Sequence, residues 1–148
     1  MQIAVLSDTH NALPEEVLPF LAQADEVWHL GDVTHEECLE PVQQMMKPLQ
    51  VVRGNCDGNW NWPWVRDLER EGFLIRLMHL PPGGEPPPGI DLLFHGHTHQ
   101  PRNGEWDGPT RYYNPGSLGK PRRGYPASFG LLELKEGEPP LWRIIELG

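Results

Sequence analysis

Five short clusters of aspartate, histidine and asparagine recur along this chain, and each follows an apolar, strand-like run of residues. The runs are IAVLS, VWHLG, VVRG, LIRLM and LLFHG, in that order. The clusters supply seven candidate metal ligands: Asp8, His10, Asp32, Asn55, His79, His97 and His99. Because buried parallel strands end at one edge of a sheet, side chains just beyond those ends converge from distant positions. Seven hard or borderline ligands suffice for two divalent ions, so the pattern predicts a two-metal site.

The spacing inside two of the clusters supports this interpretation. Asp8 and His10 lie two residues apart, so a carboxylate oxygen and an imidazole nitrogen can reach one ion from the same side of a turn. His97 and His99 repeat the spacing, and this pair can point to different ions. A single histidine in a chain of this size is more often structural, but the joint order of the clusters favours metal binding.

Asp32 and Asn55 have the chemistry of catalytic residues as well as that of ligands. Asp32 follows a glycine that permits a tight turn, and its two carboxylate oxygens offer the usual bridge between paired ions. The Asn55 carbonyl oxygen can bind an ion while its amide group donates to a phosphate oxygen. His29 and His95 precede ligand turns, where we expect them to orient a ligand rather than to bind an ion themselves.

Composition restricts the class of protein. At 148 residues, the chain is expected to form a single domain over residues 1–148. The N-terminal residues lack the features of a signal peptide and no apolar run reaches membrane-spanning length, so we expect a soluble, cytoplasmic protein with no membrane partner. Cys38 and Cys56 are expected to be free thiols. The formal net charge of -9 disfavours sequence-independent binding to nucleic acid.

Apolar periodicity predicts an α/β chain that becomes mostly β after its first third. Strands are expected at residues 2–7, 26–30, 49–53, 73–80, 90–95, 111–114, 128–134 and 141–146. Helices are expected at residues 14–24 and 35–47, and Pro19 should break or kink the first of them. The alternation of strands and helices at the start of the chain indicates parallel crossovers. Residues 58–64 and 81–89 are predicted as loops.

A set of short motifs in this order resembles that of the calcineurin-like metallophosphoesterases. The motifs are SDTH at 7–10, HLGD at 29–32, GNCD at 54–57, His79, GHTH at 96–99 and NPGS at 114–117. The resemblance runs nearly end to end, and it is strongest for the small YfcE-like phosphodiesterase branch of that superfamily. As an ordered set, the motifs are highly specific.

The resemblance implies a fold, a site and a reaction. The implied fold is a two-sheet β-sandwich flanked by helices, in a four-layer αββα arrangement. One ion would be held by Asp8, His10, Asp32 and His99, and the other by Asp32, Asn55, His79 and His97. The two divalent ions would be manganese, nickel, iron or zinc. The implied reaction is hydrolysis of a small phosphodiester by a hydroxide that both ions share, with Asp32 and Asn55 acting in catalysis.

The chain departs from the pattern of this family in three places. Cys56 stands where many relatives have a histidine proposed to protonate the leaving group, and a neutral thiol is a poor proton donor to an alkoxide. Asp57 is a candidate substitute for that donor. Leu80 replaces the glycine that usually follows the motif histidine. Relatives tend to place a helix after that histidine, but the proline-rich residues 81–89 cannot form one, so we expect that face of the site to be more open.

Other interpretations are compatible with the sequence. The chain could be a non-catalytic, metal-binding scaffold for protein interaction with the same fold, or a nuclease that acts on short single strands. Trp60, Trp62 and Trp64 could line a substrate pocket, but internal packing or a contact within a homo-oligomer would explain them equally well. The basic residues around NPGS could attract phosphate or be solvated loop charges. These residues are Arg102, Arg111, Lys120, Arg122 and Arg123.

Overall fold

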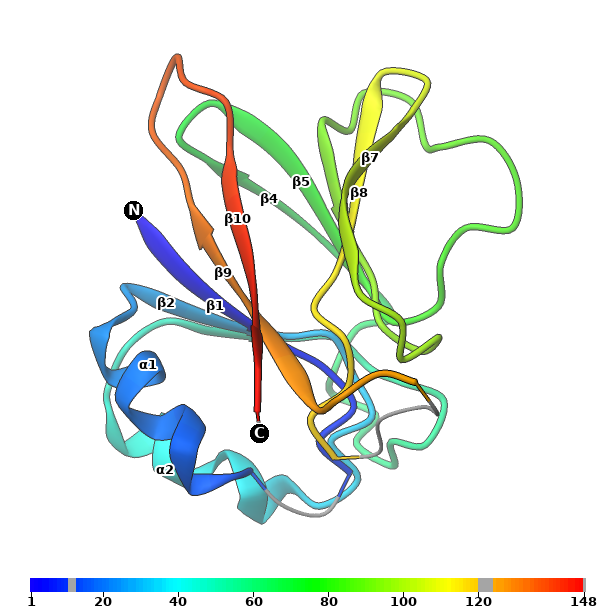
Figure 1. The fold of residues 1–148 in the computed structure, drawn as a ribbon. Helices are drawn as coiled ribbons and strands as arrows, with labels where there is room; N and C mark the ends of the chain where they lie inside the picture. Colours follow the sequence, from blue (N-terminus) through cyan, green and yellow to red (C-terminus); the bar gives the residue numbers. More distant parts are fainter. Residues whose placement is uncertain (11–12, 120–123, 148) are drawn as a thin grey trace.

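Two five-stranded sheets dominate the computed structural model, which describes residues 1–10, 13–119 and 124–147 (Figure 1). The first sheet has the order β10-β9-β1-β2-β3, and its strands are β1 (Gln2–Leu6), β2 (Glu26–His29), β3 (Leu49–Val51), β9 (Ser128–Glu133) and β10 (Leu141–Glu146). The second sheet has the order β4-β5-β6-β8-β7, and its strands are β4 (Val65–Arg70), β5 (Phe73–Met78), β6 (Leu92–Phe94), β7 (Arg102–Asp107) and β8 (Thr110–Asn114). Both sheets contain parallel and antiparallel pairs.

The core lies between the two sheets and on the far side of the first sheet, as alternation along β1 shows. Ile3 and Val5 belong to the buried cluster between the sheets, together with Phe94 of β6. Ala4 and Leu6 belong to a second buried cluster, which contains residues from the helices. A strand that is buried on both faces has a continuous apolar sequence, and this explains the run IAVL at the start of the chain.

Parallel pairing brings the polar motifs to one edge of each sheet. Strands β1, β2 and β3 run parallel in the first sheet, and β5, β6 and β8 run parallel in the second. Each of these six strands ends just before one of the motifs identified in the sequence, or at its first residue. The parallel arrangement expected for the first three strands is confirmed.

Two short helices connect the first three strands. They are α1 (Leu18–Gln23) and α2 (Glu40–Gln44), and each follows a 3-10 helix, η1 (Glu15–Val17) and η2 (Glu36–Leu39). Each helix expected from the sequence is therefore split in two. Pro19 and Pro41 explain the split, because proline lacks an N–H group and fits only the first turn of an α-helix. The break at Pro19 was expected, whereas the break at Pro41 has no counterpart among the expectations.

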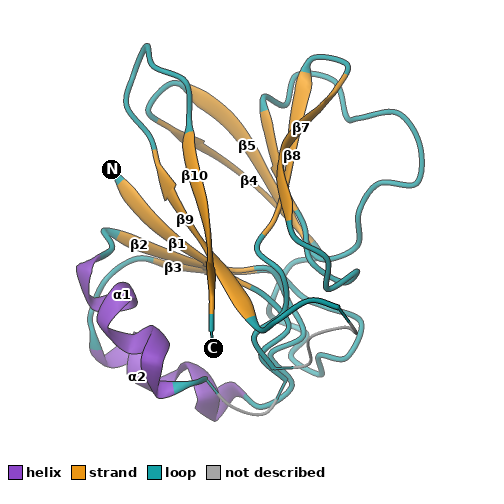
Figure 2. Cartoon of the chain, viewed as in Figure 1, coloured by secondary structure: helices purple, strands orange, loops and turns teal. Residues whose placement is uncertain are grey.

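Both helices cover the first sheet on the side that faces away from the second sheet, as Figure 2 shows. The expected two-sheet sandwich with flanking helices is confirmed. Within the described ranges, however, no helix covers the outer face of the second sheet, so the fourth layer of the αββα arrangement is missing there. Residues 81–89 form turns and bends, as their prolines predict. None of the described helices is long and apolar enough to cross a membrane.

Two strands of the second sheet, β4 and β7, have no counterpart among the predicted strands. Their sequences are VRDLER and RNGEWD, in which polar and charged residues outnumber apolar ones. Both strands lie at the edges of the sheet, and their residues are mostly exposed or half-buried. Edge strands that bury little apolar surface give a weak periodic signal, which explains why the sequence does not identify them.

A bidentate ion pair links the two sheets. Glu26 of β2 is 1% exposed, and Arg70 of β4 donates to its two carboxylate oxygens over 2.9 and 2.8 Å. A second pair of the same kind joins Arg76 to Asp67, but both of its members are partly exposed on the outer face of the second sheet. The two pairs therefore have similar geometry and different burial.

Arg70→Ala should destabilise the fold strongly, because it leaves the buried Glu26 carboxylate without a partner. We expect the free energy of unfolding to fall by about 3 to 5 kcal/mol. Arg76→Ala is the matched control, and removal of this exposed pair should cost less than about 1 kcal/mol. Urea denaturation followed by circular dichroism measures both values. Equal losses in the two variants would show that burial of Glu26 does not set the cost.

Candidate metal centre

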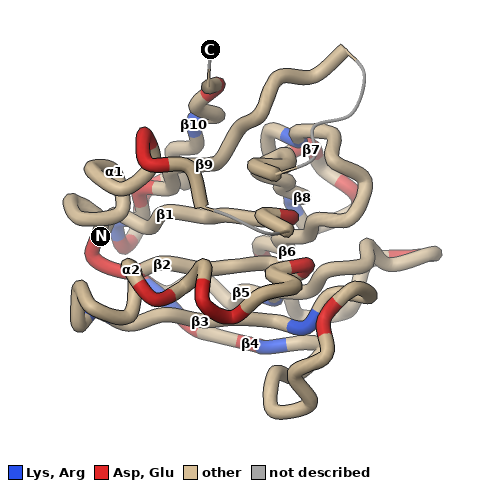
Figure 3. Tube along the Cα trace, turned by 90° about the horizontal axis from the view of Figure 1, so that it is seen from below, with Lys and Arg blue, Asp and Glu red and all other residues tan. Residues whose placement is uncertain are grey.

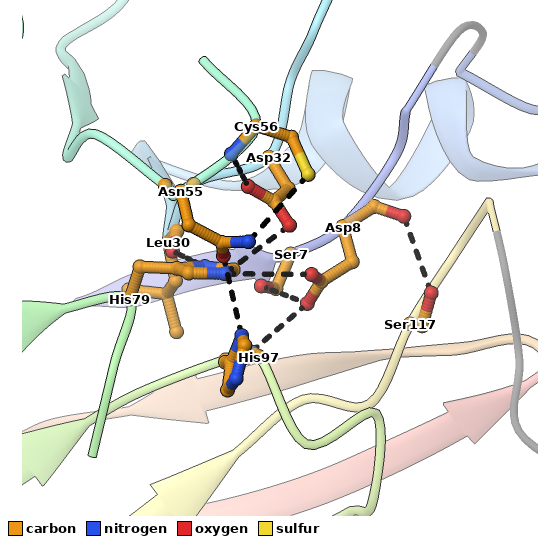
Figure 4. A network of polar contacts seen from close by, with 12 residues as sticks. Ser7, Asp8, Leu30, Asp32, Asn55, Cys56, His79, His97 and Ser117 are labelled. Carbon is orange, nitrogen blue, oxygen red and sulfur yellow. Dashed lines mark hydrogen bonds and ion pairs between the residues drawn. The ribbon is translucent and has the colours of Figure 1, made fainter.

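The expected ligands come together beyond the ends of β1, β2, β5 and β6 (Figure 4). The Nε2 atom of His79 lies 3.2 Å from Oδ2 of Asp32 and 3.8 Å from Oδ1 of Asp8. The Nε2 atom of His99 lies 3.2 Å from the same Asp8 oxygen, and Nε2 of His10 lies 4.0 Å from the same Asp32 oxygen. Four loops that are distant in sequence thus place two carboxylates and three imidazoles around one space.

Two overlapping groups of ligand atoms have the spacing of a metal site. Asp8, His10 and His99 form one group, and Asp8, Asp32 and His79 form the other. Within each group, one atom from every residue lies within 4.8 Å of the others. Asp8 belongs to both groups, and Asp32 lies near both His10 and His79. Each carboxylate therefore lies near histidines of both groups. The assignment of Asp32 as the bridge between two ions stays a prediction.

Asn55 and His97 complete the expected set at its solvent side. The Asn55 Oδ1 atom lies 3.2 Å from Nδ1 of His97, and the His97 ring centroid lies 5.3 Å from that of His79. Among the seven expected ligands, only Asn55 is exposed. Its amide group is therefore accessible to a ligand that enters from solvent.

The buried atoms Oδ1 of Asp8 and Nε2 of His79 make no hydrogen bond. Buried polar atoms are normally hydrogen-bonded, and an unpaired one costs about 1 to 3 kcal/mol. Both atoms face the shared space, where a divalent cation would pair with each of them. Carboxylate and imidazole donors suit manganese, iron, nickel and zinc alike. The residues present therefore fit a metal centre, without selecting the metal.

The turns that hold the ligands have an unusual backbone conformation. Five of the eight described non-glycine residues with positive φ are expected ligands: Asp8, His10, Asp32, His97 and His99. In residues 8–10 and 97–99, the first and third residues are both left-handed. A left-handed conformation costs a non-glycine residue about 1 kcal/mol or more, and such strain concentrates at functional sites. The repeated geometry explains why two ligands two residues apart can face the same space.

Two glycines are required because ligand side chains approach their backbone. A Cβ atom on Gly54 would collide with the Asp32 carboxylate. A Cβ atom on Gly96 would collide with the Ser7 hydroxyl and lie 3.0 Å from Oδ2 of Asp8. The absence of a side chain at Gly54 and Gly96 therefore makes room for the carboxylates of Asp32 and Asp8.

Three neighbours fix the orientation of Asp8. Its Oδ2 atom accepts a hydrogen bond from the Ser7 hydroxyl at 2.6 Å and one from the His97 backbone N–H at 3.3 Å. The Ser117 hydroxyl donates to the Asp8 backbone carbonyl at 3.2 Å. These contacts occupy one carboxylate oxygen and leave Oδ1 directed toward His79 and His99.

Hydrogen bonds also fix the histidines in and around the site. The Nδ1 atom of His79 lies 2.8 Å from the Leu30 carbonyl, to which it donates, so the Nε2 lone pair faces the site. His29 accepts from the Gly31 N–H at Nδ1, and its Nε2 then donates to the Thr9 hydroxyl. Burial lowers the pKa of His29 to about 3, so the ring is neutral. His29 belongs to neither group of ligand atoms.

His95 has a similar supporting position behind the second histidine turn. Its Nε2 atom accepts from Arg102 at 3.2 Å, so its Nδ1 donates to the Gly96 carbonyl at 3.0 Å. Burial lowers the pKa of His95 to about 4. Asn114 donates to the same carbonyl and to the Thr98 hydroxyl. Neither Asn114 nor Ser117 was among the expected site residues, although both belong to the motif NPGS at the end of β8.

Asp57 binds backbone groups and is not placed to protonate a leaving group. Its Oδ2 atom accepts from the N–H groups of Asp32 and Gly54 at 2.9 and 2.8 Å, and its Oδ1 atom accepts from that of Thr34 at 2.8 Å. The side chain is buried, with 6% of the residue exposed. Asp57 therefore ties the loop after β2 to the loop after β3, and its suggested role as a proton donor is not supported.

The electrostatics of the site reflect competition between burial and ion pairing. Burial raises the pKa of Asp8, and the nearby His79 opposes this only in part. Burial acts in the same direction on Asp32, but contacts with His79 and the Cys56 N–H outweigh it and hold the pKa of Asp32 below its usual value. Burial would lower the pKa of His79, yet the two carboxylates raise it overall.

Cys56 lies beside the site as a neutral thiol. Burial, together with the charge of Asp32, raises its pKa above the ordinary value. Cys56 and Cys38 are both free, as expected.

Two of the basic residues near NPGS are described, and both contact neighbouring groups. Arg102 donates to His95, and Arg111 donates to the Gly104 carbonyl and stacks on Trp106. The remaining members of the set, Lys120, Arg122 and Arg123, lie outside the described residues. The two described arginines are thus engaged by neighbours rather than directed at the ligands.

Comparison with known proteins agrees with the geometry. Residues 1–137 match the calcineurin-like phosphoesterase superfamily domain. The chain belongs to this superfamily. It is 32% identical over 163 aligned residues to phosphodiesterase YfcE of Escherichia coli strain K12, and the alignment covers 90% of this chain and 88% of that protein. A probable metallophosphoesterase of Methanothermobacter thermautotrophicus is also 32% identical, over 82% of this chain and 80% of that protein.

Solved structures share the fold. The structure of YfcE from Escherichia coli aligns with a TM-score of 0.73 and 29% identity, over 90% of this chain and 88% of that one. Vps29 from Entamoeba histolytica, solved in complex with zinc, aligns with a TM-score of 0.78 over 99% of both chains. At 21% identity, the likeness to Vps29 shows the fold alone.

Asp57→Asn should weaken metal binding, because an amide nitrogen cannot accept the hydrogen bonds that the carboxylate accepts from the two loops. We expect about 10-fold to 100-fold lower affinity for manganese or zinc, measured by competition with a chelating dye. The exposed Asp107→Asn is the matched control and should leave the affinity unchanged. Unchanged affinity in Asp57→Asn, combined with slower turnover of substrates with poor leaving groups, would instead restore the role of proton donor.

Proposed function

We propose that this protein is a divalent-metal-dependent phosphodiesterase with two ions in its site. The observation that carries the proposal is the pair of overlapping ligand groups joined at Asp8, in a member of the phosphoesterase superfamily. The identity with phosphodiesterase YfcE favours diesters over monoesters. Vps29 from Entamoeba histolytica, which shares the fold, was solved in complex with zinc, and this is compatible with the proposed divalent metal.

The proposed substrate is a small phosphodiester rather than a long nucleic acid. Long nucleic acids bind through broad basic surfaces. The net charge is -9, and in the view of Figure 3 the described Lys and Arg positions are scattered among Asp and Glu positions without a continuous basic face. A small ester needs only local contacts at the site itself.

The side chains of this chain have distinct roles in the proposed reaction. When bound, two ions would supply Lewis acidity and lower the pKa of water, so that hydroxide forms near neutral pH. Asp8 and Asp32 would hold the cations and balance their charge, and the Leu30 carbonyl keeps His79 in the orientation for binding. The exposed amide of Asn55 can donate to a phosphate oxygen, which stabilises the charge that develops in the transition state.

Asp32→Ala should remove both ions and reduce hydrolysis of bis(p-nitrophenyl) phosphate about 10³-fold or more, because Asp32 is the predicted bridge. Elemental analysis of the gel-filtered protein measures the metal, and added manganese should restore activity to the chelator-treated parent protein but not to the variant. Asp107→Ala, an exposed aspartate on β7, is the control. Retention of two ions in Asp32→Ala would contradict the bridge. A metal-loaded parent protein that hydrolyses no phosphoester would favour the scaffold over the enzyme.

Turnover should depend steeply on the acidity of the leaving group, because Cys56 is a poor proton donor and Asp57 is committed to backbone N–H groups. General-acid assistance is worth about 10² to 10⁴ in rate, and aryl diesters that need none should react much faster than alkyl diesters. Cys56→Ser should change the rates less than about twofold. The test is a plot of log kcat/KM against leaving-group pKa. A shallow slope would reveal another proton donor in the site.

A further inference from the structure

An apolar pocket of about 340 Å³ adjoins the metal centre. Its lining residues are Arg53, Trp64, Val65, Met78, His79 and Leu80. His79 is a member of the candidate metal centre as well, so the two spaces share a wall. The pocket lies where the second sheet has no helical cover in the described part of the chain.

The register of β4 and β5 explains why apolar side chains line this pocket. Leu77 belongs to the core between the sheets, so its neighbour Met78 points to the outer face. Val65 pairs directly with Met78 across the two strands. Leu80, which follows His79, is 43% exposed, and Val65 is 41% exposed. Large apolar side chains are thus left accessible to solvent beside a polar site.

Arg53 gives the pocket a positive charge, and none of the described carboxylates forms an ion pair with it. Its guanidinium carbon lies 3.6 Å from the Trp60 ring centroid and 4.5 Å from that of Trp64. The residue is 7% exposed, and within the described ranges it forms no ion pair. Trp62 instead packs against a small apolar cluster of Val33, Leu39 and Val51. The three tryptophans of residues 60–64 therefore differ in role: Trp62 packs internally, whereas Trp60 and Trp64 contact the Arg53 guanidinium.

We propose that this pocket binds an aromatic ester group of the phosphodiester substrate. Trp64 and Leu80 supply the apolar contact surface for the ring, and the charge of Arg53 attracts the phosphate toward the neighbouring metal centre. The volume lies within the range of ligand pockets and exceeds that of a phenyl ring. This inference rests on the proposed function and narrows its substrate class to aromatic phosphodiesters.

The test compares two ligands that differ only in the group on phosphorus. Calorimetry with the metal-loaded protein measures the binding of phenylphosphonate and of methylphosphonate. We expect phenylphosphonate to bind about tenfold more tightly, as contact with an aromatic ring on this scale predicts. Trp64→Ala and Leu80→Gly should each reduce that preference severalfold while methylphosphonate binding stays constant. Trp106→Ala, an exposed tryptophan on β7, is the control and should keep the preference.

Kinetics with bis(p-nitrophenyl) phosphate separate failure of the pocket from failure of the proposed function. The expected result is hydrolysis by the parent protein and about tenfold lower kcat/KM in Trp64→Ala, mostly through KM. No preference for phenylphosphonate in the parent protein, or an unchanged preference in both pocket variants, would overturn the pocket while hydrolysis continues. Absence of hydrolysis with the preference intact would overturn the proposed function instead.

Discussion

Two buried carboxylates set the main physical demand on this structure. Asp8 and Asp32 are 0% and 3% exposed. The His79 ring lies near both carboxylates, and the His10 ring lies near that of Asp32. An uncompensated charge in the interior costs several kcal/mol, so each carboxylate needs donors on every side. The Ser7 hydroxyl and the His97 N–H donate to the Asp8 carboxylate, and the Cys56 N–H donates to that of Asp32 at 2.9 Å. The remaining oxygens face the shared space, where a divalent cation is the natural counter-charge.

Backbone conformation and hydrogen bonds around the site orient the ligand side chains in the absence of a bound ion. The left-handed backbone at the ligand positions has an energetic cost, and it persists because neighbouring groups over-determine it. Asp57 fixes two of the loops through three backbone N–H groups, and Asn114 fixes a third through Gly96 and Thr98. Each of these loops follows a strand of one of the two sheets. Preorganisation of this kind means that little of the ion's binding energy is lost in ordering the protein.

The sequence predicts which polar residues come together at the ends of the strands, because two simple patterns coincide there. Buried parallel strands have continuous apolar sequences, and polar residues that interrupt such runs at their ends stand out. The same reasoning does not detect β4 and β7, whose edge positions leave no apolar pattern. It also does not reveal that the Asp57 carboxylate accepts from three backbone N–H groups, two of which come from the loop after β2. Contacts between residues distant in sequence, such as Ser117 with Asp8, leave no trace in local sequence.

The end of β5 shows how one strand register links stability, chemistry and specificity. Leu77 packs in the core between the sheets, Met78 lies on the outer face, His79 enters the metal centre and Leu80 borders the apolar pocket. Because side chains alternate along a strand, a shift of one residue would move all of them to the wrong side at once. The proline-rich residues 81–89 that follow form no helix over this face, so the pocket wall stays accessible. A substitution at Leu80 would therefore test the proposed ester specificity, whereas a substitution at His79 would alter the candidate metal centre itself.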